Sequence, residues 1–123
     1  MDHVNAKDRF FRYEENFLNC SRGCSRTLDQ LSKADGNINR IIATSVEIEG
    51  EISEAESYVR AMDVEHRNIM GADKRDFVDR VRNYRDELKD LNQRFTKVKF
   101  QDIMFSTRII SLSPQVIIST FCT

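Results

Sequence analysis

Apolar residues recur at alternating steps of three and four in three successive stretches of the chain. These stretches cover residues 10–31, 38–66 and 77–98, and few other apolar residues lie between them. A 3-4 alternation places side chains along one face of an α-helix, whereas a half-buried strand shows a period of two. The pattern therefore predicts three amphipathic helices, each with one face that must be buried against the others.

The breaks between these stripes are short and contain turn-forming residues. Asp35-Gly36 separates the first two stripes, and Gly71 ends the second helix. Asn5 is a candidate N-cap of the first helix, and Asn37 or Asp35 is the candidate for the second. Short connections make neighbouring helices antiparallel. We therefore expect an all-α fold, an antiparallel up-down-up three-helix bundle with left-handed, coiled-coil-like packing. The expected helices cover about residues 6–33, 37–68 and 73–99.

Length and charge limit the classes of function. The 123 residues suffice for one domain with a modest core. Charged residues make up 32% of the chain, but the formal net charge is only −1, so we expect no nucleic-acid partner. The N-terminus lacks the apolar run of a secretory signal, so this chain alone is expected in the cytosol.

The three cysteines fit a reducing compartment, because their number is odd and their spacing forms no disulfide framework. Cys20 and Cys24 lie four residues apart on the first stripe. As metal ligands they would have to recruit His3 or His66. We favour the simpler interpretation that they are buried as small hydrophobic side chains.

Sequence motifs for catalysis are absent. The chain has no Gly-rich phosphate loop, nucleophile elbow, His-Glu-x-x-His motif or calcium loop. The inward Glu-x-x-His pairs of a di-iron bundle are missing from the stripes. A run of glutamates on the second helix is expected to form a solvated face: Glu47, Glu49, Glu51, Glu54 and Glu56. We therefore expect a protein that is not an enzyme, with no catalytic residue, no metal site and no cofactor.

The segment after residue 100 differs from the rest, because residues 103–123 carry one charge, Arg108. Three interpretations stay open: a disordered tail foreign to the domain, a tail loosely docked on the bundle, and a membrane-spanning helix. The last is the least favoured, because the segment is short and contains Arg108 and Pro114. We assign residues 1–100 to the bundle and 101–123 to an atypical apolar tail.

Three stretches resemble one family. Residues 9–17, RFFRYEENF, resemble the aromatic-Tyr-Glu-x-x-Phe opening of the N-terminal domain of Vti-type SNARE proteins. Residues 54–67, EAESYVRAMDVEHR, resemble the end of its second helix, with a Met-Asp-x-Glu-x-Arg signature. Residues 80–97, RVRNYRDELKDLNQRFTK, are similar to its third helix. The resemblance covers roughly residues 8–99.

The resemblance implies the regulatory, Habc-like domain of a Qb-type SNARE in vesicle-mediated transport between Golgi and endosomes. It implies recognition by the ENTH domain of an epsin-related clathrin adaptor, at the cytosolic face of Golgi or endosomal membranes. Family members carry a SNARE helix and a membrane anchor after this domain, which the residues after 100 do not resemble. Contacts with other SNAREs and with a membrane are therefore expected only through a longer form.

Six apolar residues lie off the stripes, and most are expected to widen the core: Phe11, Ile42, Val46, Tyr58, Val64 and Met70. Tyr58, Val64 and Met70 lie along the end of the second helix, beside the best match to the family. Tyrosine and methionine are common in recognition patches, so we take these three as a candidate docking site. Its expected polar rim consists of Arg60, Arg67 and Arg85.

Two alternatives to a monomeric interaction module stay open. The first is a structural coiled-coil or spectrin-like scaffold domain whose helices assemble between chains. The reversals at Asp35-Gly36 and Gly71 argue against it, since a long parallel coiled coil avoids them. The second is an enzyme that uses the Cys20/Cys24 pair.

Overall fold

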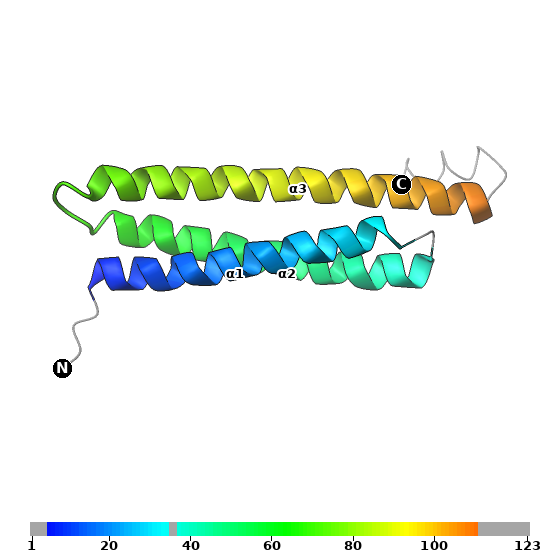
Figure 1. The fold of residues 1–123 in the computed structure, drawn as a ribbon, viewed down its shortest axis with the longest axis horizontal. Helices are drawn as coiled ribbons and strands as arrows, with labels where there is room; N and C mark the ends of the chain where they lie inside the picture. Colours follow the sequence, from blue (N-terminus) through cyan, green and yellow to red (C-terminus); the bar gives the residue numbers. More distant parts are fainter. Residues whose placement is uncertain (1–4, 35–36, 111–123) are drawn as a thin grey trace.

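The fold is a bundle of three long helices. The computed structural model describes residues 5–34 and 37–110, with side chains over 5–34 and 37–101. Helices α1 (Ala6–Ser32) and α2 (Ile38–His66) pack side by side, and α3 (Lys74–Ile110) runs along both (Figure 1). No strand occurs in these residues. The predicted all-α three-helix bundle is confirmed.

Ion pairs between the helices show their directions. Arg9, at the start of α1, lies 2.9 Å from Glu65 at the end of α2, so these helices are antiparallel. Lys7 lies 2.6 Å from Asp73, which directly precedes α3, so α1 and α3 are parallel. The chain therefore runs up, down and up, as Figure 1 also shows.

Both predicted N-caps are present. The Asn5 side chain accepts a hydrogen bond of 2.9 Å from the Asp8 amide, and the Asn37 side chain accepts one of 3.1 Å from the Arg40 amide. Each bond satisfies one of the amides that a helix start leaves without a partner. The predicted reversal at Asp35-Gly36 lies outside the described residues.

Two helix ends differ from the prediction. Helix α2 ends at His66 rather than near residue 68, and Gly71 lies in the following connection with a φ of 98°. That positive φ favours glycine and lets the chain reverse there. Helix α3 runs on to Ile110 rather than ending near residue 99. The physical reason is that the sequence holds no proline or glycine between Lys99 and Ile110. The expected disorder or docking of residues 111–123 lies outside the described residues.

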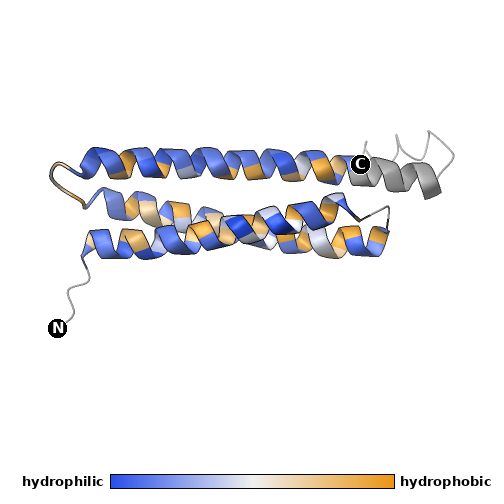
Figure 2. Ribbon diagram, in the orientation of Figure 1, coloured by the Kyte–Doolittle hydropathy of each residue, from blue (hydrophilic) through white to orange (hydrophobic). Residues whose placement is uncertain are grey.

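The predicted stripes form the core, and hydrophobic and hydrophilic residues alternate along each helix accordingly (Figure 2). The core has two parts. We call the first the aromatic cluster, which contains Phe10, Phe17, Ala55, Val59, Met62, Ile69, Phe77, Val81 and Leu88. We call the second the aliphatic cluster, which contains Cys24, Leu28, Leu31, Ala34, Ile41, Ile48, Ile52, Leu91 and Phe95.

Most of the off-stripe apolar residues do not widen the core as predicted. Tyr58 does so, because it is half-buried and packs against the aromatic cluster. The other five are exposed: Phe11, Ile42, Val46, Val64 and Met70. The stripe residue Ile38 is also exposed, because it is the first residue of α2. The buried stripes are thus narrower than expected, and apolar side chains remain on the outer surface.

Candidate docking surface

The end of α2 and the connection to α3 present two exposed apolar side chains of the predicted site. Val64 is 55% exposed on the last turns of α2, and Met70 is 77% exposed in the connection. Both side chains are available to a partner. Ile69, which directly precedes Met70, is buried in the aromatic cluster and anchors the connection to the bundle.

Asp63 organises the charges beside these apolar residues. Its carboxylate lies 2.7 Å from Arg67 of its own helix, 3.0 Å from Arg85 of α3 and 2.9 Å from the His66 ring. Its side chain is only 17% exposed, whereas Arg67 and Arg85 are mostly exposed. The structure thus brings two predicted rim arginines together on one carboxylate and leaves much of each guanidinium accessible.

The electrostatics of Asp63 follow from these partners. Burial alone would raise the pKa of its carboxyl. The hydrogen bond with His66 and the charges of Arg85 and Arg67 outweigh burial, so the pKa of Asp63 is lowered. The carboxylate therefore stays ionised and ties α2 to α3 at neutral pH.

Tyr58 and Arg60 lie apart from this group. Arg60 is exposed and approaches Glu56 at 3.9 Å. The Tyr58 hydroxyl donates a hydrogen bond of 2.8 Å to Glu54, and its ring lines a groove between α2 and α1. The six predicted residues therefore do not form one group. Asp63 joins Arg67 to Arg85 of α3 near the end of α2, where Val64 and Met70 are exposed. Tyr58 faces α1, and Arg60 pairs with Glu56 of its own helix.

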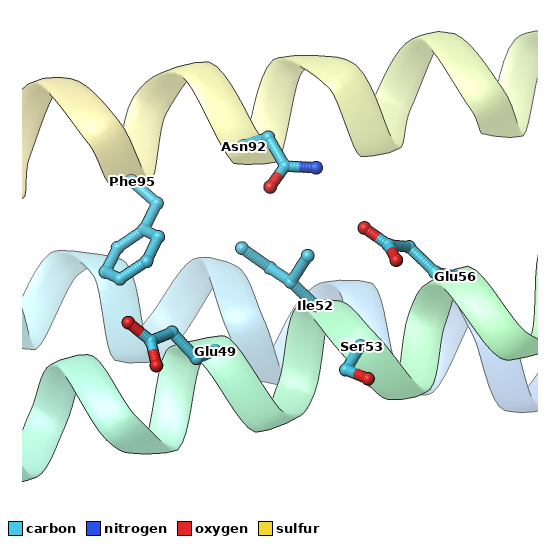
Figure 3. A pocket seen from close by; sticks show the side chains of 6 residues that line it. All are labelled: Glu49, Ile52, Ser53, Glu56, Asn92 and Phe95. Carbon is cyan, nitrogen blue, oxygen red and sulfur yellow. The ribbon is translucent and has the colours of Figure 1, made fainter.

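Two surface grooves between helices were not predicted from the sequence. The first lies between α2 and α3, with Ile52 and Phe95 among polar side chains from both helices (Figure 3). Its volume is about 220 Å³, and its lining residues are Glu49, Ile52, Ser53, Glu56, Asn92 and Phe95. The second lies between α1 and α2 and measures about 330 Å³. Its lining residues are Asn16, Asn19, Cys20, Gly23, Glu51, Glu54 and Tyr58.

The glutamates of α2 match the predicted solvated face in part, because Glu47, Glu49 and Glu54 are exposed, whereas Glu51 and Glu56 are half-buried. Glu49 faces α3, where it binds Lys99 at 3.2 Å. Glu51 faces α1, and its Oε1 atom is buried without a hydrogen-bond partner. The signal in the sequence was the spacing, because Glu51 directly precedes Ile52 of the stripe, and residues flanking a stripe lie against the neighbouring helix.

The cysteine pair lies in the interior. Cys24 is fully buried in the aliphatic cluster, and the half-buried Cys20 thiol donates to the Glu51 carbonyl over 3.1 Å. Burial raises the pKa of each thiol to about 11, so thiolate is scarce at neutral pH. His66 binds Asp63 instead, and His3 lies outside the described residues. Within residues 5–34 and 37–101, no three histidine, cysteine or acidic side chains are close enough together to hold a metal ion.

Residues of the family-like stretches meet across the bundle. Glu14 of the first stretch receives two hydrogen bonds of 3.1 Å from Arg80 and one of 2.5 Å from the Tyr84 hydroxyl. Phe17 packs on Tyr84, with their ring centres 4.9 Å apart. Asp63 and Arg67 of the second stretch form the charged group described above. These stretches therefore carry several of the contacts that join the three helices.

The comparison with protein families agrees with this geometry. A family model described as "Vesicle transport v-SNARE protein N-terminus" matches residues 7–99. The chain belongs to this family. The resemblance to the Habc-like N-terminal domain of Vti-type SNAREs is thereby confirmed. No curated protein and no solved structure matches the chain significantly.

The v-SNARE family links this chain to vesicle transport. Among the helices of the described part, none has the length and apolar character to cross a membrane.

Proposed function

We propose that this chain acts as the regulatory N-terminal domain of a SNARE in transport between Golgi and endosomes, at the cytosolic face of those membranes. We further propose that it is monomeric and is recognised by the ENTH domain of an epsin-related clathrin adaptor. The observation that carries this proposal is the family match over residues 7–99. Pairing with other SNAREs and membrane attachment are proposed only for a longer form.

The end of α2 is the docking surface that we propose for the adaptor. Val64 and Met70 offer apolar area, and Arg67 and Arg85 offer charge beside it, held in place by Asp63. An apolar centre with an arginine-rich rim is typical of protein interfaces. Binding needs no catalytic group, and the high thiol pKa values of Cys20 and Cys24 speak against the enzyme hypothesis.

A scaffold whose helices assemble between chains is less well supported. Both core clusters draw side chains from all three helices of one chain. The apolar stripes are therefore used within the molecule, and a helix from another chain is not needed to bury them.

Titration of the isotope-labelled chain with an ENTH domain tests the proposal. We expect a Kd in the micromolar range, roughly −8 kcal/mol. Amide shifts should concentrate at Val64, Arg67, Met70 and Arg85. Shifts elsewhere only would refute the site, and the lack of any shift would refute the partner.

A matched pair of substitutions sharpens this test. Val64→Asp places a charge in the proposed surface, whereas Val46→Asp places one on a comparably exposed valine of the same helix (55% against 62%). We expect Val64→Asp to weaken binding at least about tenfold and Val46→Asp to leave it nearly unchanged. Equal effects of both would contradict the site.

A further inference from the structure

Exposed apolar side chains gather in the half of the bundle where α2 begins. Ile42 and Val46 lie one turn apart on α2, and Phe100 lies on α3; all three are more than half exposed. Phe100 follows Lys99, which reaches Glu49 of α2 over 3.2 Å. The two helices therefore present these apolar side chains on either side of their junction. Contiguous exposed apolar surface on a charged protein marks a place that another segment or molecule covers.

The three side chains extend the groove between α2 and α3 toward this end of the bundle. Glu49 and Ser53 line the groove from α2 (Figure 3), and Val46 precedes them on the same helix face. From α3 the groove is lined by Asn92, and Phe100 lies two turns further along that face. We call the surface formed by Ile42, Val46 and Phe100 the apolar end of the groove.

Helix α3 carries the chain to the same place. It runs antiparallel to α2 and ends beyond the start of that helix (Figure 1). From the level of the Lys99–Glu49 pair, α3 continues for about 16 Å to Ile110. Ile42 and Val46 lie about 5–10 Å from that level in the same direction. The residues after Ile110 therefore need to turn back by only about 6–12 Å to reach the apolar end of the groove. About four residues of extended chain cover that distance.

The sequence after α3 suits this surface. Residues 109–123 contain no aspartate, glutamate, lysine or arginine, whereas 32% of the whole chain is charged. Pro114 has no amide hydrogen and does not continue a helix, so the Ser113-Pro114 pair predicts a turn shortly after α3. The apolar side chains beyond this turn are Val116, Ile117, Ile118 and Phe121. A turn followed by an uncharged apolar run is what a segment needs in order to fold back on an apolar surface.

We propose that residues 116–121 of this chain pack on the apolar end of the groove. Packing there removes apolar surface of both partners from water. The start of α2 is suited to such a contact because residues 37–46 contain one charged residue, Arg40. An uncharged segment therefore covers this surface without taking several charged groups out of water.

The tether to α3 favours this segment over a second copy of the chain. A segment joined by a short linker reaches its site at an effective concentration of the order of millimolar, whereas a second copy loses translational and rotational freedom when it binds. The apolar end of the groove lies at the opposite end of α2 from Val64 and Met70. The proposal is therefore independent of the adaptor surface, and its test uses no adaptor.

Nuclear Overhauser effects in the full chain, with labelled isoleucine and valine methyl groups, test the proposal. We expect them between the methyl groups of residues 116–118 and those of Ile42 and Val46. The absence of these effects would overturn the proposal. A mixed sample of labelled and unlabelled chains identifies the occupant, because effects between the two kinds of chain would show that a second copy covers the surface, and the proposal would then be wrong.

Paired variants of the full chain locate the contact. Ile42→Asp with Val46→Asp places two carboxylates on the apolar end of the groove, and both positions are exposed, so the bundle should keep its fold. We expect amide hydrogen exchange of residues 116–121 to become about tenfold faster. Val64→Asp with Met70→Asp makes the matched change at the other end of the bundle, and exchange should change less than about twofold. Equal effects of the two double variants on residues 116–121 would contradict the contact.

A reciprocal variant leaves every described residue unchanged. Ile117→Asp with Ile118→Asp alters only the proposed occupant, so it tests the contact even if the α2 variant fails to fold. We expect the amide shifts of residues 42, 46 and 100 to change, while those of residues 64 and 70 stay the same. If the shifts of residues 42, 46 and 100 also stay the same, residues 116–121 do not cover this surface.

Discussion

The two parts of the core are built from different side chains and are surrounded by different polar contacts. In the aromatic cluster, the rings of Phe10 and Phe77 meet edge to face at 4.7 Å, and Arg80 lies 5.6 Å above the Phe77 ring. In the aliphatic cluster, the main contacts are those of leucine and isoleucine side chains, with Phe95 as the one ring.

The polar contacts follow the same division. Around the aromatic cluster, Glu14 binds Arg80 and Tyr84 of α3, and Asp63 binds Arg85. Around the aliphatic cluster, the one ion pair between helices in the part of the chain that the structure describes is Lys99 with Glu49, and both side chains are about half exposed. Directional contacts fix how helices align, whereas aliphatic packing tolerates small shifts. The end that presents Val64 and Met70 is therefore the more precisely aligned of the two.

The largest effect is expected from Glu14. Glu14→Ala leaves the part-buried Arg80 and the half-buried Tyr84 hydroxyl without their shared acceptor. We expect the free energy of unfolding to fall by about 2–4 kcal/mol. Glu49→Ala removes the exposed pair at the other end and should cost less than about 1 kcal/mol. Urea unfolding of both variants measures the difference, and equal losses would contradict the division between the two ends.

A smaller effect, dependent on pH, is expected from Asp63. Because its pKa in the folded chain is lowered below the ordinary aspartate value of 3.8, the stability that it provides is present above that pH. This stability is lost as the pH falls through the folded pKa. Asp63→Asn should therefore lower the free energy of unfolding by about 2 kcal/mol at pH 7.

The control for Asp63 is Asp79→Asn, because Asp79 is exposed and its one ion pair among the described residues is with Arg82 at 3.8 Å. The free energy of unfolding is measured from pH 7 down to pH 2. The values for Asp63→Asn and for the parent chain should converge as the pH falls, whereas those for Asp79→Asn should equal the parent values at every pH. If the free energy of unfolding of Asp63→Asn differs from that of the parent chain by the same amount at every pH, Asp63 stabilises the fold through its shape and not through its charge.

Much of this architecture was predictable from the sequence. The 3-4 spacing of apolar residues gave three helices and most of the core, because helical periodicity is a local property of the chain. The N-caps at Asn5 and Asn37 were predictable for the same reason, since each bond spans three residues. The extension of α3 to Ile110 was missed because a change in composition was taken for a helix end, although no helix breaker stands there.

The candidate site was less predictable. Nothing in the spacing shows that Asp63 collects Arg67 from its own helix and Arg85 from the next, because the second contact depends on the register of two helices. The same register decides that Tyr58 faces α1 while Asp63 faces α3. The presence of each helix follows from a local sequence pattern. Which residues pair between helices depends on how the helices pack, and a single sequence does not show that packing.

The smallest effect compares two buried serines. Ser21 is 5% exposed and donates a hydrogen bond of 2.6 Å to Glu87, whereas Ser45 is 6% exposed and its hydroxyl has no partner among the described residues. Alanine removes the same atoms at both positions, so the volume change is matched. Ser21→Ala should lower the free energy of unfolding by about 1 kcal/mol, since it loses a hydrogen bond to a charged group. Ser45→Ala should raise it by up to about 1 kcal/mol, because it removes an unpaired buried hydroxyl.

Urea unfolding of the two variants measures both changes in the free energy of unfolding, and changes of opposite sign would support this account. A loss at Ser45 as large as that at Ser21 would mean that the Ser45 hydroxyl has a partner in solution, and α2 would then be held by a polar contact at both ends.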